Sequence, residues 1–92
     1  PKEIEELIDA MPGVVESAVI GVPHPDFGEA VTAVVVKKKD ANELTDVALI
    51  QALKKEIANY KVPKKVFFVD DLPRNAMGKV QKNVLRETYN TR

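Results

Sequence analysis

The sequence predicts an α+β domain, built as an α/β layer in which helices pack on the faces of a small three-stranded sheet. Two runs rich in Val and Ile, residues 14–22 and 30–36, are separated by a loop with two prolines and a glycine, which indicates an antiparallel pair of strands. Stretches with helical spacing precede and follow this pair, and a third apolar run covers residues 66–69. The predicted element order is therefore α-β-β-α-β-α.

The first predicted helix has apolar residues at the i, i+3, i+4, i+7 spacing of an amphipathic helix, namely Ile4, Leu7, Ile8 and Met11. Acidic residues occupy its first turn, where the helix dipole favours negative charge. Pro12 and Gly13 are expected to end it.

The second predicted strand, residues 30–36, is apolar almost without interruption, which predicts burial on both of its faces. Residues 23–29 before it are expected to form a rigid loop. In the third strand Phe67 and Phe68 are adjacent, so their side chains should point to opposite faces of the sheet. They therefore do not make the one-sided stacking platform of RNA-binding sheets.

The second helix is expected to begin after the N-cap residue Thr45 and to end near Pro63. Its apolar face is predicted to contain Ile50, Leu53, Ile57 and Tyr60. A short closing helix should follow residue 82, with an apolar face of Val84, Leu85, Thr88 and Tyr89.

Length and composition indicate one domain, residues 1–92, of ordinary globular composition with 45% hydrophobic and 30% charged residues. The absence of cysteine excludes disulfides and thiolate metal sites, and we expect a cytoplasmic protein. No apolar run approaches the ~20 residues that span a bilayer, so no membrane association is expected.

The net charge is zero but unevenly distributed, because residues 1–60 carry 6 basic and 11 acidic side chains, and residues 61–92 carry 8 basic and 3 acidic ones. The C-terminal third could face a phosphate, a nucleotide or a nucleic acid, or could be a solvated basic face. A small basic nucleic-acid-binding module is thus one alternative reading, although aromatic residues are not interleaved with the basic ones.

The loop at residues 70–82 is the strongest candidate for a functional site. Pro73 restricts its own φ and Gly78 permits a positive φ, so the loop has a defined shape that can present Lys79 as a mobile point charge. A P-loop is excluded, because that motif would require Gly in place of Pro73 and Ser or Thr in place of Val80.

Other polar residues carry weaker signals. His24 is the single histidine and cannot build a metal cluster; between two prolines it is more typical of a loop contact than of a general base. Asp70 and Asp71 could be paired carboxylates, but they are better explained as a polar exit from the sheet. No metal site is predicted.

The loop sequence PRNAMGKVQK, residues 73–82, resembles the C-terminal signature of the adenylate-forming enzymes, which include acyl-CoA synthetases, firefly-luciferase-like enzymes and peptide-synthetase adenylation domains. PKEIE at 1–5, VIGVPHPDFGE at 19–29 and YKVP at 60–63 resemble further segments of the same C-terminal domain, in the same order. Within the family the similarity is greatest to malonyl-CoA synthetases and related short-chain enzymes.

This resemblance implies that the chain is the mobile C-terminal domain of an acyl-CoA synthetase, whose large N-terminal domain is its partner. The reaction would use ATP, with Mg²⁺, and CoA as substrates, bound mainly by the N-terminal domain, so the isolated domain should be inactive. The resemblance makes Lys79 the adenylation lysine and places Pro73, Arg74 and Gly78 in the loop that supports it. An adenylation domain that serves a carrier-protein thiol is a second alternative.

The family resemblance also implies a CoA-facing surface and a regulatory site. Candidate CoA-binding residues lie in the first strand and the loop after it, namely Gly21, Pro23, His24 and Gly28. The lysine equivalent to Lys79 is a known acetylation target in this family. The expected regulators are therefore a GNAT-type protein acetyltransferase and a sirtuin-type deacetylase.

Overall fold

The structure is a computed structural model, which describes residues 2–24, 28–41, 44–58 and 61–89. The elements follow one another as α1 (Lys2–Asp9), β1 (Val14–His24), β2 (Gly28–Lys37), α2 (Asp46–Lys54), β3 (Lys65–Val69) and α3 (Lys82–Tyr89). The strands form one sheet in the order β1-β2-β3, in which β1 and β2 are antiparallel and β2 and β3 are parallel. The predicted α+β class and element order are confirmed.

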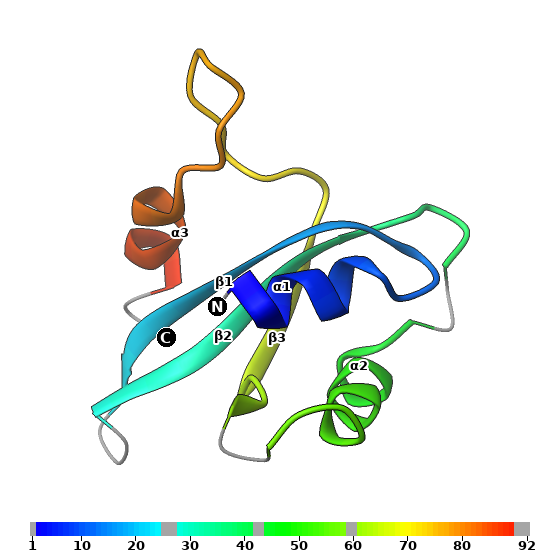
Figure 1. Ribbon diagram of the computed structural model, residues 1–92. Helices are drawn as coiled ribbons and strands as arrows, with labels where there is room; N and C mark the ends of the chain where they lie inside the picture. The colour runs from blue at the N-terminus through cyan, green and yellow to red at the C-terminus, as the bar shows by residue number, and fades with distance from the viewer. Residues whose placement is uncertain (1, 25–27, 42–43, 59–60, 90–92) are drawn as a thin grey trace.

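The sheet is covered on both faces (Figure 1). Helices α1 and α2 pack on one face, over a core of Ile4, Ile8, Val14, Val19, Ala33, Val35, Leu49, Leu53 and Val62. Helix α3 packs on the other, over Ala18, Ile20, Val22, Ala30, Val34, Val36, Leu72, Leu85 and Tyr89. The central strand β2 contributes to both cores and Ala33, Val34 and Val35 are fully buried, which confirms its predicted burial on both faces.

Helix α1 forms with Ile4 and Ile8 buried and acidic residues in its first turn, but it ends at Asp9, before the predicted end at Pro12 and Gly13. Leu7 and Met11 of the predicted apolar face are partly buried, and Met11 follows the helix. The chain turns at Gly13, whose φ of +89° lies in the left-handed region. A Cβ atom at this position would lie 2.9 Å from the Cβ of Ala41, so both the conformation and the space call for glycine.

The loop predicted for residues 23–29 is wrong at both ends. Pro23 and His24 continue β1 and pair with Glu29 and Gly28 of β2, so the two strands form a long hairpin. Pro23 is tolerated because β1 is an edge strand, where a missing N–H need not break the sheet. The remaining residues of that loop, 25–27, lie outside the described residues.

Helix α2 is shorter than predicted. Thr45 is the N-cap, since its Oγ1 accepts a hydrogen bond from the Ala48 N–H at 3.1 Å. The helix ends at Lys54 because the chain must turn back toward β3, and Ile57 follows the helix. Its buried residues are Leu49, which the predicted stripe omitted, and Leu53; Ile50 and Ile57 are partly buried, and Tyr60 lies outside the described residues.

The apolar face predicted for the last helix is half correct. In α3, Leu85 and Tyr89 are buried, whereas Val84 and Thr88 are exposed. The Tyr89 ring stacks on Phe67 with centroids 4.5 Å apart. Phe67 packs against the core under α3 and Phe68 against the core under α1 and α2, so the prediction of opposite faces is confirmed.

No helix in the described ranges is long and apolar enough to cross a membrane.

Candidate functional site

The segment between β3 and α3 stands away from the body of the domain as a narrow loop, drawn in orange at the top of Figure 1. Its two sides are joined by an antiparallel bridge between Arg74 and Val80. The Gln81 N–H donates to the Pro73 carbonyl at 2.7 Å, and the Asn75 N–H donates to the Lys79 carbonyl at 2.9 Å. These bonds close the base of the loop, so its shape does not depend on packing against the core.

Asn75 organises the tip of the loop from inside. Its Oδ1 accepts hydrogen bonds from the N–H groups of Met77, at 2.9 Å, and Lys79, at 3.0 Å. Its carbonyl accepts a third bond from the Gly78 N–H at 3.0 Å. An Asn that bonds backbone N–H groups a few residues ahead is a typical turn former. The residue after the turn, Lys79, therefore has a defined backbone position.

Gly78 has a φ of +82°, which L-residues rarely adopt. A Cβ built there would meet no atom within 4 Å. Glycine is therefore required at this position by the backbone conformation and not by a lack of space.

Arg74 ties the loop to itself and to the sheet. Its Nη1 donates to the Gly78 carbonyl at 2.8 Å, and its Nη2 forms an ion pair with Glu16 of β1. The contact is possible because the loop leaves the sheet at the end of β3, where Val69 is paired with Val36 of β2 and Val36 with Glu16.

Lys79 is exposed and its ammonium has no ion-pair partner within the described ranges. The two other cations of residues 74–82 do have partners: Arg74 has Glu16, and Lys82 has Glu5, with Nζ and Oε2 2.7 Å apart. Among the described residues, the positive charge of the loop that no carboxylate compensates is therefore that of Lys79. Such an ammonium can approach two anions at once and stabilise the charge between them.

The predicted CoA-binding residues lie at the other end of the molecule. Gly21 is inside the β1–β2 ladder opposite Val31, whereas Pro23, His24 and Gly28 form the end of the hairpin. Figure 1 shows this hairpin end and the Lys79 loop on opposite sides of the domain. The structure therefore brings Pro73, Arg74, Gly78 and Lys79 together and keeps the CoA-binding candidates apart from them.

The predicted polar exit from the sheet is confirmed at Asp70 and Asp71, both exposed, with Asp71 Oδ1 accepting a bond from the Leu72 N–H at 2.9 Å. Across the residues that the structure describes, there is no cluster of three or more His, Cys, Asp or Glu side chains that could hold a metal ion.

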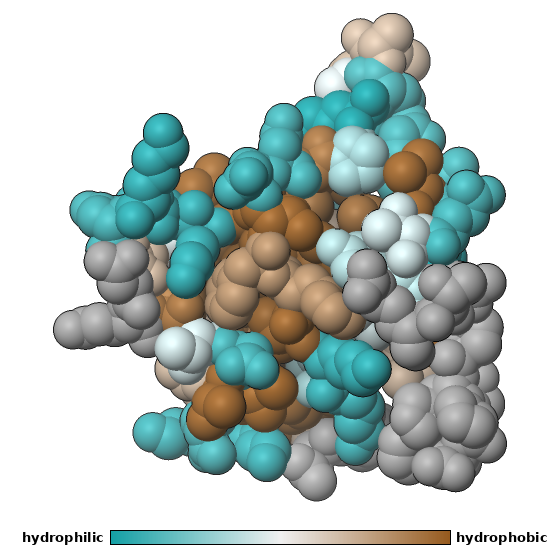
Figure 2. All heavy atoms as spheres, turned by 180° about the vertical axis from the view of Figure 1, so that it is seen from behind, coloured by the Kyte–Doolittle hydropathy of each residue, from teal (hydrophilic) through white to brown (hydrophobic). Residues whose placement is uncertain are grey.

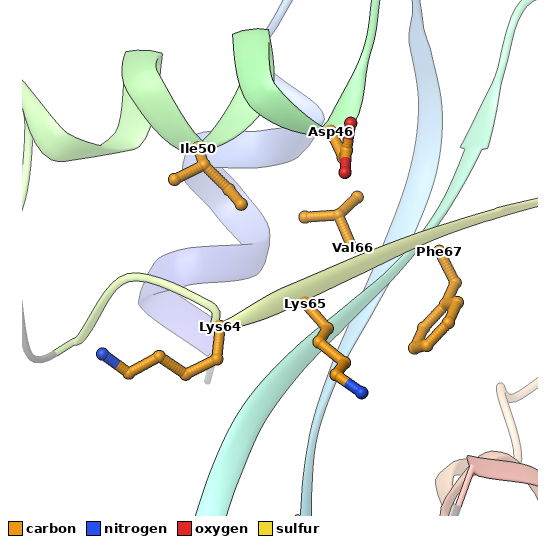
Figure 3. A pocket seen from close by; sticks show the side chains of 6 residues that line it. All are labelled: Asp46, Ile50, Lys64, Lys65, Val66 and Phe67. Atoms are coloured by element: carbon orange, nitrogen blue, oxygen red, sulfur yellow. The ribbon is translucent and has the colours of Figure 1, made fainter. Parts of the chain in front are cut away.

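A hollow of about 370 Å³ lies between α2 and β3 (Figure 3) and is lined by Asp46, Ile50, Lys64, Lys65, Val66 and Phe67. In Figure 3 Val66 points toward α2 and Ile50, whereas Lys65 and Phe67 lie on the other side of the β3 ribbon. The hollow adjoins the beginning of β3, so it is separate from the Lys79 loop, which follows the end of that strand.

Two residues of the site had not been predicted. Asn75 had a local signal, since an Asn followed three residues later by Gly is typical of a turn. Glu16 had none, because 58 residues separate it from Arg74 and nothing in its neighbourhood indicates a role.

The model of the AMP-binding enzyme C-terminal domain family matches residues 3–79. The chain belongs to this family. The match confirms the resemblance to the C-terminal domain of adenylate-forming enzymes. The long-chain-fatty-acid–CoA ligase FadD13 of Mycobacterium tuberculosis is 46% identical over 89 residues, which are 97% of this chain and 17% of that protein. The oxalate–CoA ligase of Saccharomyces cerevisiae is 39% identical over 89 residues, 97% of this chain and 16% of that protein.

Solved structures of family members have the same fold. ATP-bound MatB from Rhodopseudomonas palustris superposes with a TM-score of 0.95 at 68% identity, covering 98% of this chain and 18% of that one. The amide bond synthetase McbA from Marinactinospora thermotolerans superposes with a TM-score of 0.90 at 33% identity, covering 96% and 18%. The chain therefore spans less than a fifth of the length of these family members.

Proposed function

We propose that this domain is the mobile C-terminal part of an ATP-dependent acyl-CoA synthetase. In that reaction a carboxylate attacks the α-phosphate of ATP to give an acyl-adenylate and pyrophosphate, and the CoA thiol then displaces AMP. The observation that carries the proposal is the presentation of Lys79, an exposed ammonium at the end of a closed loop, with no ion-pair partner among the described residues. The names of the relatives, which are CoA ligases, support the reaction class.

Lys79 would act in the first step only. A carboxylate and an α-phosphate repel each other, and a cation placed between them stabilises the transition state by neutralising charge as the new bond forms. This role requires Lys79 to stay protonated. In the second step the domain would rotate and present another face, and the hairpin residues Gly21, Pro23, His24 and Gly28 are our candidates for contacts with CoA.

The partner that completes the active site would be the enzyme's own N-terminal domain, which would bind ATP with its Mg²⁺ and the acid. An apolar band visible in Figure 2, bordered by hydrophilic side chains, offers a surface for such a partner. Strand β3 belongs to the exposed edge of the sheet, and four of its five residues are only half-buried. Without the partner we expect no activity, because this domain alone holds neither ATP nor the acid.

For the acyl group we propose malonyl or a similar short chain. Support comes from the sequence resemblance to malonyl-CoA synthetases and related short-chain enzymes. Comparing malonate with longer acids as substrates of the full-length enzyme tests this assignment.

Replacing Lys79 tests the proposed role directly. Lys79→Ala in the full-length enzyme is expected to slow adenylation by roughly two to three orders of magnitude, because a charge-stabilising group at the reaction centre is lost. Thioester formation from a supplied acyl-adenylate should keep its wild-type rate. Pyrophosphate release and acyl-CoA formation measure the two steps separately, and Lys39→Ala is the control. Equal loss in both steps would contradict the assignment.

We also propose Lys79 as a site of reversible acetylation by a GNAT-type acetyltransferase, reversed by a sirtuin-type deacetylase. Acetylation removes the positive charge that adenylation needs, and so would act as an off switch. The exposed side chain is accessible to such an enzyme.

Mass spectrometry after incubation with acetyl-CoA and a GNAT acetyltransferase tests the acetylation site. One acetyl group is expected on the wild-type protein and none on Lys79→Arg. Acetyl groups scattered over Lys37, Lys38 and Lys39 instead would contradict it.

A second acceptor class is favoured by one comparison, because McbA, an amide bond synthetase, shares this fold at 33% identity. An amide bond forms with an amine, so this relative supports an acceptor other than CoA. The carrier-protein thiol expected from the sequence is another such acceptor, which this comparison does not support. Assaying the full-length enzyme with CoA and with a carrier protein separates these readings.

A further inference from the structure

Strand β1 contains an irregularity close to its start. Val14 pairs with Lys37 and Glu16 pairs with Val36, so the residue between them, Val15, has no partner of its own across the ladder. Val15 is also 55% exposed, which is unusual for a large apolar residue in a strand. One extra residue on one strand is a β-bulge, which redirects the side chains next to it.

The bulge changes the face on which Glu16 lies. In a regular strand Val14 and Glu16 would share a face, because side chains alternate with a period of two. Here Val14 is part of the core under α1 and α2, whereas Ala18 and Ile20, which continue the alternation from Glu16, belong to the core under α3. The bulge therefore keeps Val14 in one core and places Glu16 on the α3 side, where Arg74 lies.

From Glu16 a chain of contacts leads to Lys79. The Glu16 carboxylate pairs with Nη2 of Arg74, and Nη1 of the same guanidinium donates to the Gly78 carbonyl at 2.8 Å. The Gly78 carbonyl belongs to the peptide group whose N–H is that of Lys79, and this N–H donates to Asn75 Oδ1. The same peptide plane is thus held from both sides.

Both side chains are partly exposed, Glu16 at 25% and Arg74 at 38%, so we expect the ion pair to orient Arg74 more than to stabilise the fold. A planar guanidinium can keep two acceptors at fixed angles, which a flexible ammonium cannot do. Without the carboxylate, Arg74 would still be able to reach Gly78, but nothing from the sheet would hold it there.

We propose that Glu16 is a positioning residue for adenylation, which acts through Arg74 to set the direction of the loop that presents Lys79. This inference rests on the proposed function of Lys79. It adds a residue from the opposite end of the chain, whose role is to connect the loop to the sheet. A reacting group displaced by about 1 Å can lose on the order of 100-fold in rate, so a loop anchor has a measurable effect.

The test is a double-mutant cycle in the full-length enzyme, with Glu16→Gln, Arg74→Gln and the two combined. Glu16→Gln preserves shape and removes only the charge. We expect it to slow adenylation roughly ten-fold, between the few-fold effect of an exposed ion pair and the cost of a misplaced reacting group. Thioester formation from a supplied acyl-adenylate should be unchanged, and Glu16→Asp should restore most of the adenylation rate.

Glu56→Gln is the matched control, because Glu56 is exposed, follows α2 and has no side-chain partner in the part of the chain that the structure describes. Since Glu16 acts through Arg74, the double variant should be no slower than Arg74→Gln alone. The inference would be overturned if the rate losses of Glu16→Gln and Arg74→Gln multiplied in the double variant. Equal loss in both half-reactions, or a wild-type adenylation rate in Glu16→Gln, would also overturn it.

Measuring Lys79→Ala in the same assays distinguishes the role inferred for Glu16 from the proposed function of Lys79, on which it rests. Normal adenylation in Lys79→Ala would overturn the proposed function and the inference with it. Loss of adenylation in Lys79→Ala, together with a wild-type rate in Glu16→Gln, would overturn the inference alone.

Discussion

Thr32 carries a hydroxyl group into the middle of the sheet. It lies on the central strand β2, is 1% exposed, and its Oγ1 has no hydrogen-bond partner among the described residues. A buried hydroxyl without a partner loses its bonds to water and gains nothing in return. Its neighbours in the ladder are Ile20 and Lys65, which offer only the regular backbone pairing of the sheet.

Thr32→Val is therefore expected to raise the free energy of unfolding by about 1 kcal/mol, since a methyl group replaces an unpaired polar group of the same shape. Urea unfolding followed by circular dichroism measures the change. Thr88→Val is the control, because the Thr88 hydroxyl is exposed and donates to the Val84 carbonyl at 2.9 Å. A lower stability for Thr32→Val would mean that the hydroxyl has a partner after all.

The three cations of the loop differ by their partners and not by their residue type. Arg74 and Lys82 each face a carboxylate, Glu16 and Glu5, whereas Lys79 faces solvent. A cation that is already paired is less available to a substrate anion. Under the proposed function, Lys79 would therefore be the residue of this loop that binds the reacting anions.

At the level of elements, helix α2 depends on its N-terminal cap. It has nine residues, fewer than an isolated helix needs to be stable in water, so capping and packing both contribute. Thr45 supplies the cap through its Oγ1, and Asp46 adds a negative charge in the first turn. The buried pair Leu49 and Leu53 supplies the packing.

Thr45→Ala is expected to lower the free energy of unfolding by about 1 kcal/mol, because the Ala48 N–H loses its acceptor. Thr45→Ser, which keeps the hydroxyl, should lose much less. Thermal unfolding of both variants provides the comparison. If the two proved equally stable, the cap would make no contribution.

Among elements, β1 also shows how an edge strand can be protected. Its outer side has no strand partner in the sheet, and its backbone N–H groups could pair with another chain. At Val19 this is prevented by Glu5 of α1, whose Oε2 accepts the Val19 N–H at 2.7 Å. A side chain from a helix thus takes the place of a neighbouring strand at this position.

On the scale of the whole molecule, Glu5 connects three elements. The oxygen that accepts the Val19 N–H also faces the Nζ of Lys82 at 2.7 Å, so α1, β1 and the start of α3 meet at one carboxylate. The Glu5 side chain is 18% exposed, and its loss would leave a backbone donor without its partner. Because α3 follows the Lys79 loop directly, the same contact also secures the far end of that loop.

Glu5→Ala is expected to destabilise the fold by roughly 1–3 kcal/mol, since the Val19 N–H and Lys82 both lose their partner. Glu5→Gln keeps an acceptor for the N–H and should cost less, and Lys82→Ala should cost least. Urea unfolding ranks the three, with Glu6→Ala as the control for an exposed acidic residue of the same helix. A loss in Glu5→Ala no larger than in this control would show that the junction contributes nothing.

Much of this molecule could be predicted from local patterns. The period of apolar residues indicated α1, the unbroken run at residues 30–36 indicated a strand buried on both faces, and the turn chemistry around Gly78 indicated the loop that presents Lys79. Such patterns reflect backbone sterics and burial within a few residues, so they can be recognised from the local sequence. The ends of α2 and of the hairpin were misjudged, because tertiary packing decides where an element stops.

Local sequence patterns were sufficient to predict the element order, the strand buried on both faces and the lysine of the loop. Which cations are paired follows from the fold, because Glu16 and Glu5, the partners of Arg74 and Lys82, lie far from them in the sequence. The side on which Glu16 lies depends on a one-residue bulge, and a shift of one residue in a strand moves a side chain to the opposite face. The side of the sheet on which Glu16 lies thus depends on how β1 pairs with β2, and a local sequence pattern does not predict that pairing.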